Sequence, residues 1–221
     1  MATSEMAVPV GAQSRAASRG GTSLAAWLGI GFPVLLVAAW FLDNTPDGDA
    51  SNAKWLRWYA DGGHRTDMIV SAFLFVVAGL CLLAFLNLVW SRAGEGDRLP
   101  LGAATFGAAA IGIGGVCNAV VPGAMAFGNA PEPSPDVLRF ADNVGYPITT
   151  VAGMIAVAFA VALISLQARR SGLFGQRLTV FSIVMAVITL ASFLWFPQAA
   201  LLIWCIVVGI VLARRGGAAP A

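Results

Sequence analysis

The sequence predicts an all-α membrane protein, a bundle of six transmembrane helices with two short extracytoplasmic helices. Composition is the first reason, since apolar residues make up 58% of the chain and charged residues 11%, against about 25% charged in soluble domains. The second reason is a series of apolar runs, each near the length of about 20 residues that crosses a bilayer. The third is that no Asp, Glu, Lys, Arg or His lies in the middle of any run, because charges at that depth are costly.

The predicted elements divide the chain into one transmembrane domain over residues 23–215 and two cytoplasmic tails, 1–22 and 216–221. The first tail is rich in Ala, Gly and Ser and is expected to be disordered. The six spans are predicted over residues 24–42, 68–90, 101–121, 146–167, 178–196 and 199–213. No A-x-A cleavage site follows the first span, so we expect it to be retained as an anchor. Five spans with the first one cleaved would satisfy the charge pattern equally.

Local signals place the ends of several spans. Asp67 is expected to cap the second span, where its carboxylate meets free backbone N–H groups. Pro100 suits the first position of the third span, and Pro122 is expected to end it. The last span, with 15 residues, is short for a bilayer and needs its terminal arginines to reach the headgroups.

Two long polar loops, residues 43–66 and 123–145, separate the first and second spans and the third and fourth. The first loop is expected to hold a short helix over residues 52–60. The second is expected to hold one over residues 135–143, with Ser134 as its cap. Both loops carry an aromatic-Ala-Asp sequence just before a span.

These two loops are expected to pack together as a cap over the helix ends. Both are acidic, so specific pairs must join them, and we expect Arg65 or Arg139 to bond an Asp of the cap. Trp55 and Trp58 are expected to lie at the membrane interface, where amphipathic rings are enriched.

Positive charge predicts the orientation of the helices. Nine of the 13 lysines and arginines lie in the tails and the short turns, and four lie in the two long loops. Because positive residues favour the cytoplasmic side, we expect a multi-pass protein of the bacterial inner membrane with both termini in the cytoplasm. A net charge of +2 without a clustered basic face gives no reason to expect a nucleic-acid partner.

Small residues follow one face of the third span, at Ala103, Gly107, Ala110, Gly114 and Asn118. Such a face allows close helix packing, although it could also line a channel that ends at Asn118. Aligning Asp61 with Asp142, an offset of 81 residues, sets small residues of the second span over small residues of the fourth. A parallel repeat of a two-span unit is therefore one interpretation.

The densest polar cluster is Asp61, His64, Arg65 and Asp67. A His base oriented by an Asp, a metal site and a capping turn are the alternatives, and the chain's single His favours the turn. The residues that could line a polar pocket at the outer helix ends are Asn118, Tyr146, Thr149, Asp61, His64, Arg65 and Arg139. No cofactor motif and no nucleophile elbow is present, so the sequence does not favour an enzyme.

The order of these motifs resembles a family of small actinobacterial six-span integral membrane proteins without an assigned activity. The resemblance covers residues 24–215 and rests on four motifs: Trp58-Tyr59, Trp90-Ser91-Arg92, Asn143-Val144-Gly145-Tyr146 and Arg214-Arg215. It implies the six-span fold and transfers no site residues.

The functional expectation is a structural or interaction-based membrane protein. Its partners would be the lipid bilayer and a second copy or another membrane protein. The alternative is a small permease or export component for an apolar solute. A cavity lined by Asn118 and Thr149 would favour a permease, and a solidly packed centre would favour a structural role.

Overall fold

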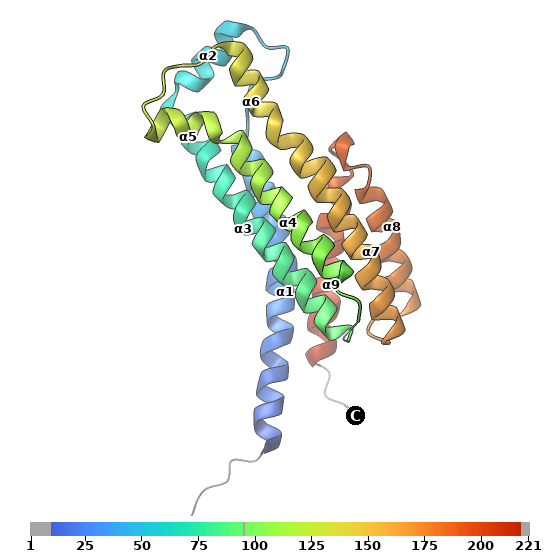
Figure 1. Ribbon diagram of the computed structural model, residues 1–221. Helices are drawn as coiled ribbons and strands as arrows, with labels where there is room; N and C mark the ends of the chain where they lie inside the picture. Colours follow the sequence, from blue (N-terminus) through green and yellow to red (C-terminus); the bar gives the residue numbers. More distant parts are fainter. Residues whose placement is uncertain (1–9, 95, 218–221) are drawn as a thin grey trace, which may run out of the picture.

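The computed structural model describes residues 10–94 and 96–217, and within them every regular element is a helix. The long helices run side by side along one axis, with shorter helices gathered at one end (Figure 1). The elements, in chain order, are α1 (Val10–Leu42), α2 (Asn52–Ala60), α3 (Gly62–Arg92), α4 (Leu99–Asn118), α5 (Val120–Phe127), α6 (Pro135–Pro147), the π-helix η1 (Ile148–Gly153), α7 (Met154–Arg170), α8 (Gln176–Thr189), the 3-10 helix η2 (Ser192–Leu194) and α9 (Gln198–Gly217).

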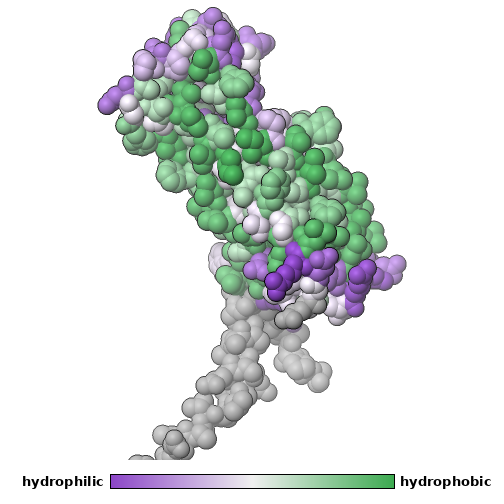
Figure 2. All heavy atoms as spheres, in the orientation of Figure 1, coloured by the Kyte–Doolittle hydropathy of each residue, from purple (hydrophilic) through white to green (hydrophobic). Residues whose placement is uncertain are grey.

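Five helices are long and apolar enough to cross a membrane, in agreement with five of the predicted spans. They cover Leu24–Leu42, Gly62–Arg92, Leu99–Asn118, Pro135–Arg170 and Gln198–Arg215. On the face shown in Figure 2, an apolar band lies between two polar ends, as expected for a surface in contact with lipid. The first of these helices continues back to Val10, so residues 10–22 of the predicted tail are helical, and residues 1–9 lie outside the described residues.

The predicted span over residues 178–196 is wrong in its last seven residues, 190–196. Helix α8 ends at Thr189 after 14 residues, which is about 21 Å of helix. The hydroxyl of Ser192 donates to the carbonyl of Thr189, a local bond that competes with helix continuation. Trp195 then takes a positive φ of 71°, and the chain reverses into α9.

The starts of two helices also differ from the predictions. Asp61, not Asp67, caps α3, because its Oδ1 accepts from the backbone N–H of Gly63 at 2.7 Å. Pro122 does not end the third span, which stops at Asn118, and it lies in the first turn of α5. Since proline has no N–H to donate to the carbonyl four residues earlier, the helix breaks at Asn118 and resumes in a new direction.

The centre of the bundle is closely packed around α4, which contacts α3 on one side and η1 and α7 on the other. A Cβ added at Gly107 would lie 2.8 Å from the Gly153 carbonyl oxygen, and one added at Gly79 would lie 2.6 Å from the Ala108 carbonyl oxygen. The predicted packing of the small-residue face of the third span is confirmed at Gly107, and Gly79 of α3 adds a second close approach to α4. The outward face of α4 remains open, with Phe106 59% exposed.

Helix α6 is continuous with η1 and α7, so residues 135–170 form one rod, here called the α6–α7 rod. We predicted a short helix over residues 135–143 and a separate span from Tyr146. At 36 residues the rod is about 54 Å long, well beyond the hydrocarbon thickness of about 30 Å. Its polar first turns, in α6, therefore project outside the apolar band and form part of the cap.

The cap consists of α2, α5 and α6, and the two long loops do pack together in it. Its core is a separate cluster of Trp55, Tyr59, Met68 and Leu138, all essentially buried. Trp55 therefore does not lie at the membrane interface as predicted, because its ring packs inside the cap. Arg139 joins the loops, although through the Ala50 carbonyl and the Asn52 side chain, each at 2.7 Å, while its ion pair is with Asp136 of its own helix.

Candidate functional site: an acidic pocket beneath the cap

A polar pocket of about 250 Å³ lies where the cap meets the helix bundle. Its walls come from the end of α1 and the residues after it, from the end of α4, the start of α9 and the reversal between α8 and α9, and from interior positions of α3 and the α6–α7 rod. The lining residues are Trp40, Asp43, Thr45, Phe75, Asn118, Asp142, Asn143, Tyr146, Thr149, Thr150, Trp195 and Gln198. We call this the cap-end pocket.

Two carboxylates from distant parts of the chain face the cap-end pocket. Asp43 follows α1 and accepts a 3.0 Å hydrogen bond from the Asn118 side-chain nitrogen. Asp142 lies in the projecting part of the α6–α7 rod and accepts from the Thr45 hydroxyl at 3.1 Å. Both partners are neutral, so the pocket holds two acids and no compensating cation from these contacts.

Burial makes these carboxylates harder to ionise. It raises the pKa of Asp43 above its ordinary value, although the hydrogen bond from Asn118 opposes that change. The pKa of Asp142 is raised to about 6, first by burial and then by the negative charge of Asp43. Near the pair, burial and the two carboxylates raise the pKa of the Tyr59 phenol as well. Ionising both carboxylates at once is therefore unfavourable unless a positive charge joins them.

Two amide oxygens, from residues that line the same pocket, have no hydrogen-bond partner in the described part of the chain. They are Oδ1 of Asn118 and Oε1 of Gln198, and both atoms are buried. The Gln198 side chain is 1% exposed, and its nitrogen donates to the Ser192 carbonyl at 3.4 Å. Because a buried acceptor without a partner costs about 1–3 kcal/mol, these atoms mark a place where a ligand or water would be stabilised.

Aromatic rings form the rest of the wall. The rings of Trp40 and Trp195 lie 5.5 Å apart between centroids, and Phe75 and Tyr146 also line the pocket. The Tyr146 hydroxyl donates to the Phe193 carbonyl at 2.8 Å, which ties the rod to the α8–α9 reversal. An acidic pocket with aromatic walls favours ligands that carry positive charge and some apolar surface.

Three of the seven residues predicted for a polar pocket line this one: Asn118, Tyr146 and Thr149. Arg139 lies in the cap instead. Asp61 caps α3, and His64 stacks on Trp58 with centroids 4.7 Å apart. Arg65 donates its backbone N–H to the Asp61 carbonyl in that turn.

The cluster around His64 is therefore a capping turn, as favoured from the sequence. Among the described residues, no three His, Cys, Asp or Glu side chains come together as a metal site.

Sequence reasoning missed Asp43, Thr45, Asp142 and Gln198 as pocket residues. Asp142 had a signal, because it belongs to the aromatic-Ala-Asp sequence that both loops share. Asp43 follows the first span directly and had been assigned to a loop. Nothing in the sequence joins these positions, because helix packing alone brings them together.

Comparison of the chain with known protein families, with curated proteins and with solved structures finds no match. The resemblance to small actinobacterial membrane proteins thus stays a prediction. The function has to be argued from the cap-end pocket and from the packing beneath it.

Proposed function

We propose that this chain is a multi-pass membrane protein that binds a small polar solute in the cap-end pocket. The observation that carries the proposal is the pair of buried, unpartnered amide oxygens of Asn118 and Gln198, two residues that line a pocket of about 250 Å³. A pocket whose only role was structural would gain stability from apolar residues at these positions. Keeping polar atoms there has a physical reason when a solute supplies the missing donors.

The pocket and the packed centre together favour binding at one end of the bundle. Asn118 and Thr149, the residues expected to line a permease cavity, do line the pocket. Directly below it the packing is tight, since a Cβ added at Gly114 would lie 2.7 Å from the Gly145 carbonyl oxygen. We therefore propose solute binding as the function, because both a carrier and a sensor must bind their solute. The polar lining of the pocket favours a polar solute over the apolar solute expected from the sequence.

A second candidate is binding of an apolar solute, as in the permease alternative. An apolar groove of about 700 Å³ lies between α4, the α6–α7 rod and α8, with Phe106, Phe159 and Leu190 among its lining residues. Phe159 is 47% exposed, so the groove opens on the surface assigned to lipid. The alternative to solute binding is a structural role, in which another membrane helix packs in the groove.

We also propose that the protein lies in the bacterial inner membrane with both termini in the cytoplasm. The start of α1 and the end of α9 lie at the same end of the bundle (Figure 1), which supports termini on one side, and the charge asymmetry favours the cytoplasm. Reporter fusions at residues 95, 130, 173 and 221 should read inside, outside, inside and inside. A fusion at residue 130 that is active only in the cytoplasm would reverse this orientation.

The proposed function is tested with Gln198→Leu in the purified, detergent-solubilised protein. The leucine removes the unpartnered oxygen, so we expect thermal stability without solute to be kept or raised and solute binding to be lost. The matched control is Asn87→Leu, at an exposed position on α3. A panel of cationic, anionic, zwitterionic and neutral small solutes is screened by thermal shift. If none of them stabilises the parent protein more than the Gln198→Leu variant, the proposal is wrong.

A further inference from the structure

The cap-end pocket has two carboxylates without a cationic partner among the described residues. In this part of the chain, Asp43 and Asp142 receive side-chain hydrogen bonds from neutral groups, Asn118 and Thr45. Among the described residues, Lys54, Arg57, Arg65 and Arg139, the basic side chains of the two long loops, form no ion pair with either carboxylate. Buried charge of one sign is costly unless an opposite charge joins it, so the pocket is suited to a cation.

The amide groups add acceptors and no donors. The nitrogen of Asn118 already donates to Asp43, and the nitrogen of Gln198 donates to the Ser192 carbonyl. These partners are acceptors and fix both amide orientations, so the two buried oxygens stay as acceptors without partners among the described residues. Both residues line the pocket, and the Asn118 oxygen lies where α4 packs against Gly145. A ligand that satisfies them must carry N–H or O–H donors.

Size and lining separate an organic cation from a metal ion. A volume of about 250 Å³ corresponds to about eight waters at about 30 Å³ each, far more than a bare ion occupies. Hard metal cations take six or more oxygen ligands, whereas Trp40, Phe75 and Trp195 give this pocket aromatic walls. Such walls attract organic cations through the ring faces.

We propose that the solute is a small organic cation with N–H donors, of the alkylammonium or guanidinium class, held between Asp43 and Asp142. Its N–H groups would bond the carboxylates and the free oxygens of Asn118 and Gln198, and its carbon atoms would contact Trp40 and Trp195. This inference rests on the proposed function, since it names the class of solute for the same pocket.

The test compares probes that differ in one property at a time. Guanidinium and urea have similar shape but different charge. Ethylammonium and tetramethylammonium are both cations, but only ethylammonium has N–H donors. Calcium and magnesium chloride test the metal alternative. All are added at low millimolar concentration and matched ionic strength to the full-length protein in detergent, and binding is followed by thermal shift and by the fluorescence of the pocket tryptophans.

We expect guanidinium or ethylammonium to bind, and urea and tetramethylammonium to bind at least tenfold more weakly. Asp142→Asn and Asp43→Asn, made separately in case one fails to fold, should each weaken cation binding at least tenfold. The control Asp49→Asn removes an exposed charge from the same loop and should leave binding unchanged.

Three outcomes would overturn the inference. Urea that binds as well as guanidinium, with no effect of Asp142→Asn, leaves a polar-solute pocket that does not select cations. Binding of calcium or magnesium that depends on Asp142 makes the site a metal site. If no probe binds, the proposal of an organic cation is wrong. The proposed function is wrong as well only if no solute of the wider panel binds.

Discussion

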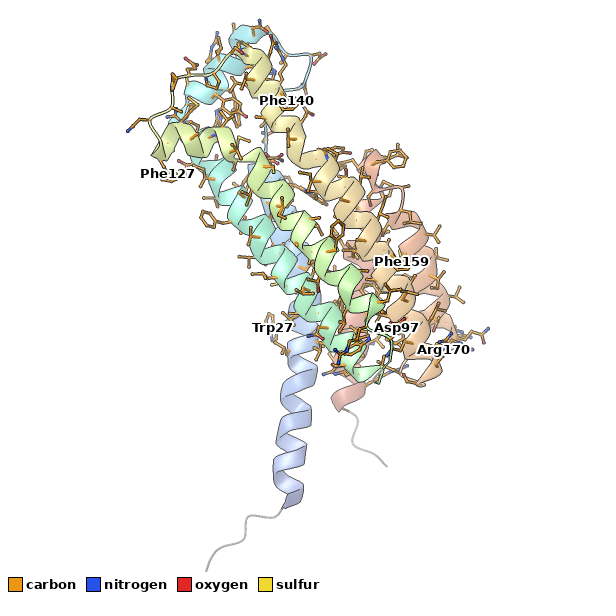
Figure 3. The ribbon with its side chains drawn as sticks, viewed as in Figure 1. Trp27, Asp97, Phe127, Phe140, Phe159 and Arg170 are labelled. Atoms are coloured by element: carbon orange, nitrogen blue, oxygen red, sulfur yellow. The ribbon has the colours of Figure 1, made fainter. Side chains whose placement is uncertain are left out.

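The two aromatic-Ala-Asp sequences, one in each long loop, have the same residue types and opposite structural roles. In Tyr59-Ala60-Asp61 the chain leaves a helix, Asp61 caps the next one, and Tyr59 is buried in the cap. In Phe140-Ala141-Asp142 the helix continues, Asp142 faces the cap-end pocket, and Phe140 is 73% exposed (Figure 3). A short shared motif therefore does not determine where its side chains point.

The residues that follow explain the difference. Gly62 and Gly63 come after the first Asp, and glycine disfavours continuation of α2. The N–H of Gly63 lies in the first turn of α3, where it has no intrahelical acceptor, so Asp61 accepts from it. Asn143 and Val144 follow the second Asp, and Asn143 donates its side chain to the Arg139 carbonyl within the helix at 2.8 Å. The carboxylate of Asp142 is thus not used as a cap and is free to enter the pocket.

The largest expected difference between the two copies concerns their aromatic residues. Tyr59→Ala removes a fully buried ring and should cost about 3–5 kcal/mol, whereas Phe140→Ala should be nearly silent. Apparent Tm in detergent, measured at one fixed scan rate, compares the two variants. Tyr59→Phe is the control, because the hydroxyl has no partner and its loss should not destabilise. Equal loss of Tm in the Tyr59→Ala and Phe140→Ala variants would contradict the assignment.

The next largest effect is at the glycines near each Asp. A Cβ at Gly145 would lie 2.0 Å from the Gly114 carbonyl oxygen, whereas one at Gly62 would meet nothing closer than 3.7 Å. Gly145→Ala should therefore destabilise by about 1–3 kcal/mol or more, as overpacking does, and Gly62→Ala should not destabilise through contact. The same Tm measurement checks this, and a Gly145→Ala variant as stable as the parent would mean that α4 and α6 are further apart.

The two Asp residues should have opposite effects on stability. Asp61→Ala loses a helix cap and should cost about 0.5–2 kcal/mol. The Asp142 pKa is raised in the fold from 3.8 to about 6, so its stabilising contribution is present below about pH 3.8 and is lost as the pH rises through about 6.

Asp142→Asn should therefore raise Tm at pH 8, and the gain should shrink at pH 5. A Tm for Asp142→Asn that falls below the parent at pH 8 would show that the carboxylate is stabilised in the fold.

The smallest expected difference in stability is between substitutions of Arg139 and Arg65, the two arginines proposed to join the loops. Arg139 bonds the Ala50 carbonyl and Asn52 and lies 5.8 Å from the Trp55 ring centroid. Arg139→Lys keeps the charge and loses the planar fork, so we expect a loss of about 0.5–1.5 kcal/mol, the usual net worth of a hydrogen bond. Arg65→Lys, which breaks no hydrogen bond between the loops, is the control. If unfolding curves recorded under the same conditions give the same stability for Arg139→Lys and Arg65→Lys, Arg139 is not the residue that joins the two loops.

Much of the fold could be predicted because it depends on local pattern. Apolar length located five helices of spanning length, and α2 occupies residues 52–60 as predicted. The failures lie where tertiary contacts decide. The predicted break between a short helix over residues 135–143 and a span from Tyr146 is absent, and the rod continues through Gly145, which packs directly against Gly114 and Asn118.

The site was harder to predict than the fold. Asn118, Tyr146 and Thr149 could be placed near helix ends from the sequence alone. Asp43 follows α1, Asp142 lies within α6 and Gln198 begins α9, and their meeting depends on how these helices pack at the cap. The sequence indicates which polar residues lie near the membrane surface. Which of them line the same pocket depends on how the helices pack.

The π-helix η1 puts the two halves of the α6–α7 rod out of phase. A π-turn adds one residue to a helix, and each residue of an α-helix turns by about 100°. Side chains after η1 are therefore rotated by that angle from where α6 alone would direct them. Val157 and Ala160 of α7 are buried in the bundle. In a rod without the added residue, orienting Asp142 toward the pocket would turn these two side chains toward lipid. Deleting Ala152 would allow either Asp142 to face the pocket or Val157 and Ala160 to stay buried, but not both. The extra residue therefore sets the rotation of α7 relative to α6 so that both contacts form in one helix.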